Sequence, residues 1–400
     1  MIRRRHVFHI GGYDPIAPER QFERFRRSLS SFERTWGVSS QTPAITDISK
    51  VSASWDVEAG GPNWKTQVTF EMLRWDDLIL HDSERGMWSR LGHSGRALFD
   101  FVVTGTFFRY VYANWRYAVF FIFPYVCILL FGLGGAGAAY GVVRLAGLAG
   151  IYAAIAGVFI AVPIFIGLMS WLGPRRRINH VLDDAIFSRE FLYGQREEIE
   201  KRIDDFAGKM VERARKADVD EIVVVAHSLG AALTMLAVAR ALKQDPQLAN
   251  HGPTLCVLTV GATVPKFSLH PKGEEIRQAT QKIAGELSIR WVEYQARDDA
   301  ISFYRFDPVT LKRVSRDYED GRPEIRRVQI HSMMDPASFR RHRFHFMRMH
   351  YQFLMGNDRR SPYDYCMIVC GPLAFDDITS PTGGLGRFRD DGSLKSRLAV

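Results

Sequence analysis

The chain has 400 residues, a formal net charge of +9, 46% hydrophobic residues and four cysteines. Four cysteines in a chain this long exclude a small disulfide-stapled scaffold. The basic excess suits either nucleic acid or an anionic membrane surface. The basic clusters at Arg3 to Arg5, Arg175 to Arg177 and Arg340 to Arg348 suit a membrane surface, and no nucleic-acid-binding motif accompanies them. We therefore expect membrane lipids as partners and no nucleic acid.

The first 80 residues predict strands around one helix. Residues 6–10 alternate as in a strand, and Gly11 and Gly12 then permit a sharp turn with close backbone approach. Pro18 begins a predicted helix. Residues 45–80 alternate around the sequence GGPNW, which is typical of a β-hairpin. Residues 86–101 show no pattern that predicts a helix or a strand.

Residues 117–172 are strongly apolar, and Arg144 is their only Lys, Arg, Asp, Glu or His residue. Arg144 separates two runs of roughly 25 residues, and about 20 residues cross a bilayer. The pattern predicts two transmembrane helices, at about residues 117–141 and 146–172, within a membrane hairpin that spans 101–178. The spacings Gly137-xxx-Gly141 and Ala153-xxx-Gly157 predict where these helices pack closely.

The charges that flank the hairpin predict its orientation. Arg109 and Arg116 precede the first span and residues 175–177 are all arginine, against the lone Arg144 in the turn. The positive-inside rule therefore places both flanks in the cytoplasm. The N-terminus resembles no signal peptide. We expect an integral protein of a bacterial inner membrane, with its soluble parts on the cytoplasmic side.

Residues 221–242, EIVVVAHSLGAALTMLAVARAL, predict a buried strand that turns directly into a helix. The tip of this turn is Ser228. So tight a turn leaves no room for bulky side chains two residues before and two after the serine, and Ala226 and Gly230 occupy those positions. The pattern predicts a nucleophile elbow that exposes the hydroxyl of Ser228 at the edge of a sheet.

The rest of the chain continues to alternate between strands and helices. Residues 253–267 read as a strand that ends at Gly261-Ala262 and a loop after it. Residues 289–294 read as a further strand, which Asp298 and Asp299 follow. The run from Cys366 to Cys370 is strand-like, and residues 376–400 read as a disordered tail. Such alternation predicts a mostly parallel sheet with helices on both faces.

Together, these segments resemble the α/β-hydrolase superfamily, in its lipase and esterase branch. The resemblance rests on the elbow around Ser228 and on the first strand with its glycine turn, although Ala226 stands where the family usually has glycine. It implies an α/β-hydrolase fold interrupted by the membrane hairpin, with residues 1–100 and 179–375 forming one domain.

The resemblance also implies a catalytic triad in the order serine, acid, histidine. Ser228 is the nucleophile. Asp299 is the chosen acid, because Asp299-Ala300-Ile301 is similar to the D-x-V or D-x-I form of lipases, and Asp298 is its rival. His350 is the chosen base, since it looks like the histidine that opens the last helix of a lipase, with His345 as the alternative.

An oxyanion hole is implied at the backbone N–H groups of Gly12 or Tyr13, together with that of Leu229. Asp14 is expected to hold this loop, and His227 to pack behind the nucleophile. No P-loop and no metal-ligand spacing are present, so neither a cofactor nor a metal is expected. The expected function is a membrane-anchored serine hydrolase that cleaves a carboxylic ester or acyl lipid through an acyl-enzyme. Acyl transfer or thioester cleavage by the same triad, and a catalytically silent membrane scaffold, are the alternatives.

Overall fold

The computed structural model describes residues 1–315, 318–319 and 321–395. In them a sheet of ten strands has the order β2-β4-β5-β1-β6-β7-β8-β10-β9, with β3 paired to β4. The strands are β1 (Arg4–Ile10), β2 (Ser39–Gln41), β3 (Ile45–Ile48), β4 (Ser52–Gly61), β5 (Trp64–Leu73), β6 (Glu221–His227), β7 (Thr254–Val260), β8 (Arg290–Ala296), β9 (Tyr318–Glu319) and β10 (Glu324–Val328).

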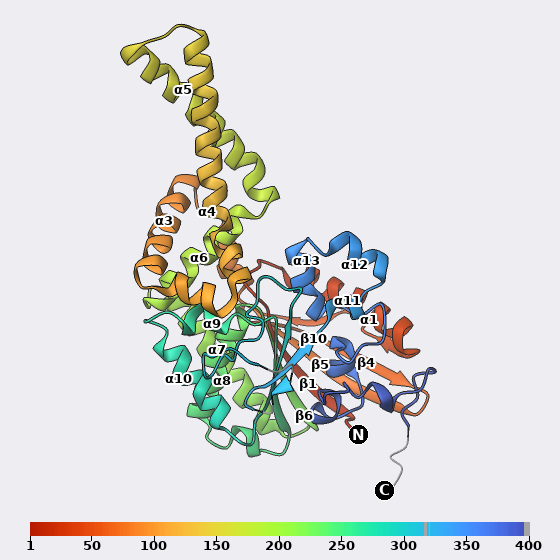
Figure 1. Ribbon diagram of the computed structural model, residues 1–400. Coiled ribbons are helices and arrows are strands. Elements are labelled where there is room, and N and C mark those ends of the chain that lie inside the picture. Colours follow the sequence, from red (N-terminus) through yellow and green to blue (C-terminus); the bar gives the residue numbers. More distant parts are fainter. Residues whose placement is uncertain (316–317, 320, 396–400) are drawn as a thin grey trace.

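The centre of this sheet is parallel. Strands β5, β1, β6, β7, β8 and β10 pair in parallel, while β2, β3 and β4 at one side and β9 at the other pair antiparallel. The predicted hairpin around GGPNW is the β4–β5 pair. The prediction of a mostly parallel sheet with helices on both faces is confirmed (Figure 1).

Helices cover the sheet and build the insertion. They are α1 (Pro18–Trp36), α2 (Asp76–Ser83), α3 (Met87–Val103), α4 (Thr106–Leu145), α5 (Gly150–Arg175), α6 (Ile178–Leu192), α7 (Glu197–Lys216), α8 (Gly230–Gln244), α9 (Val264–Ser268), α10 (Glu274–Gly285), α11 (Ile330–Met333), α12 (Pro336–His342), α13 (Phe346–Tyr351), α14 (Tyr365–Cys370) and α15 (Phe375–Ile378), with short 3₁₀ helices η1 (Leu248–Asn250), η2 (Gln352–Leu354) and η3 (Leu385–Arg387).

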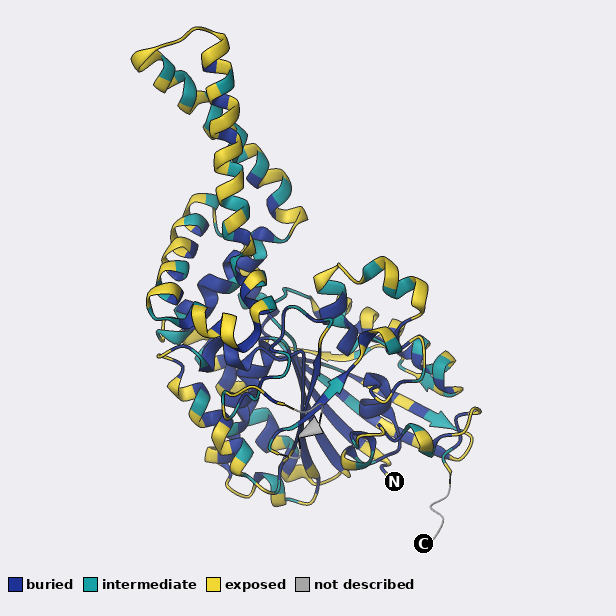
Figure 2. Ribbon diagram, viewed as in Figure 1, coloured by how far each residue is buried: buried dark blue, intermediate teal, exposed yellow. Residues whose placement is uncertain are grey.

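Alternate residues of β6 serve two hydrophobic layers. Val224 faces the layer made with α7, α8 and α10, and Val223 and Val225 face the layer made with α1 and α14. Every residue of β6 is buried, which explains its continuous apolar sequence. Figure 2 shows the buried strands enclosed between helices whose outer faces are exposed.

A buried ion pair ties the first strand to β6 and to the end of the chain. The Arg5 Nε donates to Glu221 Oε2 at 2.8 Å, and its two other nitrogens donate to the carbonyls of Gly371 and Leu373. Glu221 Oε1 accepts the backbone N–H of Phe375. Because every charge-bearing group here has partners, the pair can stay buried without an unpaired charge.

The helices α4 and α5 are each long and apolar enough to cross a membrane. They extend away from the sheet, and their surface is mostly exposed (Figures 1 and 2). Helix α4 extends beyond the predicted span of 117–141 at both ends, because the helical conformation continues into the flanking segments. Helix α5 is shifted toward the C-terminus relative to the predicted 146–172, because the turn lies at residues 146–149.

The predicted packing motif of the hairpin is wrong. A Cβ on Gly135 would lie 2.8 Å from the carbonyl oxygen of Ala161, whereas one on Gly137, Gly141 or Gly157 would meet nothing within 4 Å. The two backbones therefore approach closely at Gly135 and Ala161, and the predicted glycines do not make this contact.

The base of the hairpin is packed onto the soluble domain. Helix α4 bends at Asn114, whose φ and ψ of −154° and 102° are not helical. The Asn114 side chain donates to the carbonyl of Ser302 and accepts the N–H of Arg116, so it caps the helix segment that continues into the apolar span. Tyr110 and Tyr117 pack against Phe303 in the loop after β8.

Two local predictions are wrong, and the segment 86–101, which had no assignment, is now placed. Residues 87–101 fall within α3, and Gly86 is its N-cap. The run Cys366–Cys370 is a helix, α14, buried throughout, so its continuous apolar sequence reflects burial on all sides. The tail is not disordered over 376–395: Phe388 is buried, and Gly392 O accepts the indole N–H of Trp64. Residues 396–400 lie outside the described residues.

The buried carboxyl of Glu293 gives a pH test of the fold. It accepts from Thr259 and Gln295, and burial raises its pKa to about 7. The folded protein holds this proton more tightly than the unfolded chain. Its contribution to stability is therefore full below about pH 4.5, the ordinary value, and is lost as the pH rises through about 7. Glu293→Gln is expected to remove this slope in unfolding measurements across that range.

The helix crossing gives a second test. Gly135→Leu is expected to separate α4 from α5 and lower the thermal unfolding temperature in detergent, because its side chain meets backbone. Gly137→Leu, two residues along the same helix in open space, is the matched control and should leave that temperature nearly unchanged. Equal effects of the two variants would contradict the described crossing.

Candidate active site

Ser228 lies at a sharp turn between β6 and α8, as predicted. Its φ is +57°, a left-handed conformation that a non-glycine residue rarely adopts. Neighbouring backbone holds it there, since its N–H donates to Val260 O and its own carbonyl accepts the N–H groups of Ala231 and Thr263. The turn thus places a hydroxyl at the carboxyl ends of the parallel strands, where ligands bind in open α/β sheets.

Two glycines permit the backbone to cross beside this turn. A Cβ on Gly230 would lie 2.3 and 2.4 Å from the carbonyl oxygens of Gly11 and Ile10. A Cβ on Gly12 would lie 2.7 Å from Ser228 Cβ and 3.1 Å from its Oγ. The loop after β1 therefore runs directly beside the Ser228 side chain.

Asp299 and His350 form a buried pair. His350 Nδ1 lies 2.8 Å from Asp299 Oδ2, and the other carboxylate oxygen accepts the N–H of Ile301 at 2.9 Å. A carboxylate partner at Nδ1 keeps the proton on that nitrogen and leaves Nε2 as the basic atom. Nε2 is buried and has no hydrogen-bond partner among the described residues, Ser228 included.

The position of the pair differs in detail from the sequence-based picture. His350 lies one residue before the end of α13 and does not open a last helix, and α14 and α15 follow it. The glycine that makes room for the pair is Gly261, at the end of β7. A Cβ there would lie 3.2 Å from Asp299 Oδ2 and from His350 Cε1, at a φ of +54°.

The two rival residues lie apart from this arrangement. Asp298 is partly exposed, and the carboxylate that pairs with His350 is that of Asp299. His345 is exposed and begins α13 as its N-cap, where Nδ1 accepts the N–H of Arg348 at 3.2 Å. Of the two candidate acids and the two candidate histidines, Asp299 and His350 are the residues that contact each other.

Two hydrogen bonds support the segment that carries His350. His227 Nε2 donates to the carbonyl of His350 at 3.1 Å, and burial lowers the pKa of His227 well below its usual range, so it is neutral at pH 7. Tyr351, next to His350, donates its hydroxyl to Asp14 Oδ2 at 2.5 Å. Asp14 thus joins the glycine loop to α13, and His227 has the supporting role expected from its sequence position.

The predicted oxyanion donors lie around Ser228. Leu229 precedes the first residue of α8, so its N–H is one of the donors that a helix start leaves without an intrahelical partner. Across the described residues, the backbone N–H groups of Gly12, Tyr13 and Leu229 have no backbone acceptor. The Tyr13 side chain points elsewhere, to Asp82, so only its backbone can serve.

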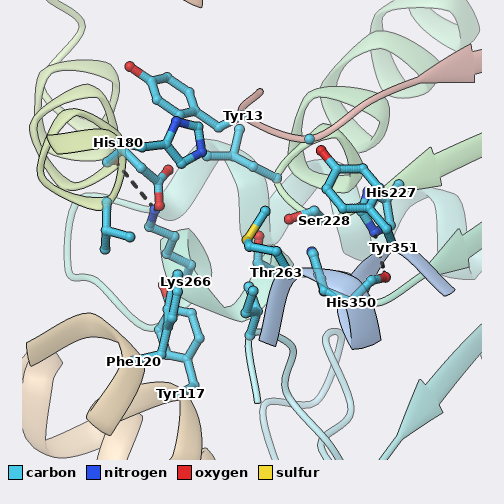
Figure 3. A pocket seen from close by; sticks show the side chains of 16 residues that line it. Tyr13, Tyr117, Phe120, His180, His227, Ser228, Thr263, Lys266, His350 and Tyr351 are labelled. Carbon is cyan, nitrogen blue, oxygen red and sulfur yellow. Dashed lines mark hydrogen bonds and ion pairs between the residues drawn. The ribbon is translucent and has the colours of Figure 1, made fainter. Parts of the chain in front are cut away.

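A small cavity of about 40 Å³ adjoins Ser228 and His350 (Figure 3). Its lining includes Gly12, Leu229 and Thr263 around the elbow. The opposite wall comes from the hairpin and the helix after it, with Tyr117 and Phe120 of α4 and His180 and Asp184 of α6 among the lining residues. The helical insertion therefore forms part of this site.

Lys266 is the functional candidate that sequence reasoning missed. It lines the cavity, its side chain is 2% exposed, and its ammonium donates to Asp184 Oδ2 at 2.6 Å. Its place just after β7 is a signal that was available, since the carboxyl ends of parallel strands share one edge. The lining by Tyr117 and Phe120 had no such signal, because nothing in an apolar span shows which side meets the domain.

The two neighbouring glycines give a direct test of the crossing. Gly12→Ala is expected to cost about 1–3 kcal/mol of unfolding free energy, because its Cβ would overlap Ser228. Gly11→Ala is the matched control: its Cβ meets only His9 Nε2, at an ordinary 3.9 Å. Thermal unfolding of the two variants should separate them, and a destabilised Gly11→Ala with an unaffected Gly12→Ala would contradict the described loop.

No group of three or more His, Cys, Asp or Glu residues placed to hold a metal ion occurs in the described part of the chain. Comparison of the chain with family models, with curated proteins and with solved structures finds no match in any of the three. The geometry of the site therefore carries the functional argument.

Proposed function

We propose that the chain is a membrane-anchored serine hydrolase with an α/β-hydrolase fold, which cleaves a carboxylic ester or acyl lipid. The observation that carries the proposal is the buried Asp299–His350 pair. His350 lines the same cavity as Ser228, and its Nε2 has no hydrogen-bond partner within the described part of the chain. The left-handed turn at Ser228 and the glycine loop beside it add the two other parts that such chemistry needs.

In the proposed reaction, Ser228 Oγ attacks the acyl carbonyl carbon while His350 Nε2 takes the hydroxyl proton. The carbonyl oxygen becomes an oxyanion, which the N–H groups of Leu229 and of Gly12 or Tyr13 stabilise. The intermediate collapses to an acyl-enzyme, and the departing alcohol oxygen receives the proton from His350. Water then attacks the acyl-enzyme by the same steps and releases the acid.

Asp299 acts through His350. Its buried carboxylate holds the imidazole in the Nδ1–H tautomer and stabilises the imidazolium that forms when Nε2 takes a proton. In free enzymes the hydrogen bond between nucleophile and base is often long and tightens only with substrate. The absence of a Ser228–His350 hydrogen bond among the described residues is compatible with this role.

A substrate from the bilayer is supported by the walls of the cavity. Tyr117 and Phe120 belong to the helix segment that continues into the apolar span. A cavity of about 40 Å³ accommodates a small group near the scissile bond, so a long acyl chain would extend out of it. The positive-inside distribution of arginines supports a cytoplasmic position for the site.

Replacing the three groups singly tests the proposal. Ser228→Ala is expected to abolish labelling by a fluorophosphonate probe, and Asp299→Asn and His350→Ala to lower ester hydrolysis on the order of 10⁴-fold. The matched controls are the rivals: Asp298→Asn, and His345→Asn, which retains a side chain able to cap α13. Both should stay within a few fold of wild type.

The same measurements separate the alternatives. Equal labelling of wild type and Ser228→Ala would remove the enzymatic assignment and leave a silent membrane scaffold. If the label depends on Ser228, adding alcohol, thiol or water acceptors to the acyl-enzyme distinguishes acyl transfer from hydrolysis, and ester against thioester substrates distinguishes a thioesterase. All these reactions use the same three side chains. The cavity, and not the triad, therefore determines which acceptor takes the acyl group.

A further inference from the structure

The turn between α12 and α13 exposes an unusual combination of side chains. We call residues 340–346 the corner. It contains Arg340, Arg341 and Arg343, all exposed, and Phe344 and Phe346, which are 78% and 52% exposed. Residues 336–357 include no Asp or Glu, so the corner has no acidic neighbour along the chain.

A solvated charged face does not account for this pattern. Arginine side chains alone would be well solvated, but two outward-facing phenyl rings expose apolar area to water, which is unfavourable. The Arg343 guanidinium lies over the ring of Phe344 at 4.8 Å, which keeps the cation and the ring at one place on the surface. Basic residues beside exposed aromatics are typical of surfaces that lie at a membrane interface.

The corner lies on the side of the domain from which the hairpin rises (Figure 1). The cavity confirms this placement, because Met347 and His350 of α13 line it together with Tyr117 and Phe120 of α4. A bilayer crossed by α4 and α5 therefore lies over the same edge of the sheet as the corner. This relation holds whichever side of the membrane the domain occupies.

We propose that the corner is a second membrane contact, which binds the headgroup layer of an anionic bilayer. Phe344 and Phe346 enter the boundary between headgroups and acyl chains, and Arg340, Arg341 and Arg343 bind lipid phosphates. The charge of the corner is complementary to an anionic surface, and each basic residue near such a surface contributes about fivefold to binding. The hairpin anchors the protein, and the corner fixes how the domain tilts against the bilayer.

This contact bears on the proposed active site, because α13 carries His350 four residues after Phe346. The inference does not require that activity, however. It concerns the position of the corner, which can be measured in a catalytically inactive protein. Failure of one proposal is therefore distinguishable from failure of the other.

The test places a polarity-sensitive fluorophore in the corner. The full chain carrying Ser228→Ala and Cys127→Ala is labelled with acrylodan at Phe344→Cys, since the three other cysteines are buried. It is reconstituted in nanodiscs of phosphatidylcholine alone or with phosphatidylglycerol added. The expected result is a shift of emission to shorter wavelength with phosphatidylglycerol. The matched control is Leu287→Cys, 73% exposed but before β8, at the opposite ends of the parallel strands; it should not shift.

Replacing Arg340, Arg341 and Arg343 together with glutamine is expected to reduce the bound fraction relative to the free fraction on the order of 10²-fold and to abolish the shift. High salt should act in the same direction. An unshifted spectrum at Phe344→Cys in anionic nanodiscs, or an equal shift at Leu287→Cys, would overturn the proposal. So would a shift that persists in the triple glutamine variant, since it would show that lipid charge is not what the corner recognises.

Discussion

The site depends on one constraint, the crossing of two backbones where a side chain would not fit. At Gly230 a single Cβ would overlap the carbonyl oxygens of Ile10 and Gly11. Because Gly230 has no Cβ, the turn at Ser228 and the loop after β1 can lie side by side, and Gly12 lies against the serine side chain. The parallel pairing of β1 with β6, in register from Arg5 and Glu221, delivers both segments to the same edge. The positive φ of Ser228 is then held by backbone bonds from β7 and α8.

The topology also explains why the hairpin of α4 and α5 and the site share an edge of the sheet. The chain leaves β5 at its carboxyl end, builds α2 to α6, and returns along α7 to begin β6. Since β5, β1 and β6 are parallel, everything between β5 and α7 starts from the edge where Ser228 lies. An insertion in this crossover therefore lies beside the nucleophile, and the packing of Tyr110 and Tyr117 on Phe303 fixes it there.

Patterns carried by neighbouring residues were readable from the sequence. The strand, turn and helix around Ser228 follow from residues within a few positions of one another, and so does the β4–β5 hairpin. Contacts between residues far apart in the sequence were harder to predict. The choices of Asp299 and His350 over their neighbours rested on resemblance, and only the fold brings these two within 2.8 Å. The crossing at Gly135 and the helix at Cys366–Cys370 were missed because apolar sequence alone reveals neither partner nor direction.

The bend of α4 at Asn114 separates a docked segment from a continuous helix that includes Tyr117 and Phe120 and continues to Leu145. Apolar helices adapt to a thinner bilayer by tilting. Tyr117 and Phe120 line the cavity beside Ser228 and lie in the same helix segment as the apolar span, so in the proposed membrane setting a change of tilt would move one wall of the cavity. In the proposed membrane setting, the thickness of the bilayer therefore bears on the shape of the cavity as well as on the tilt of the helices.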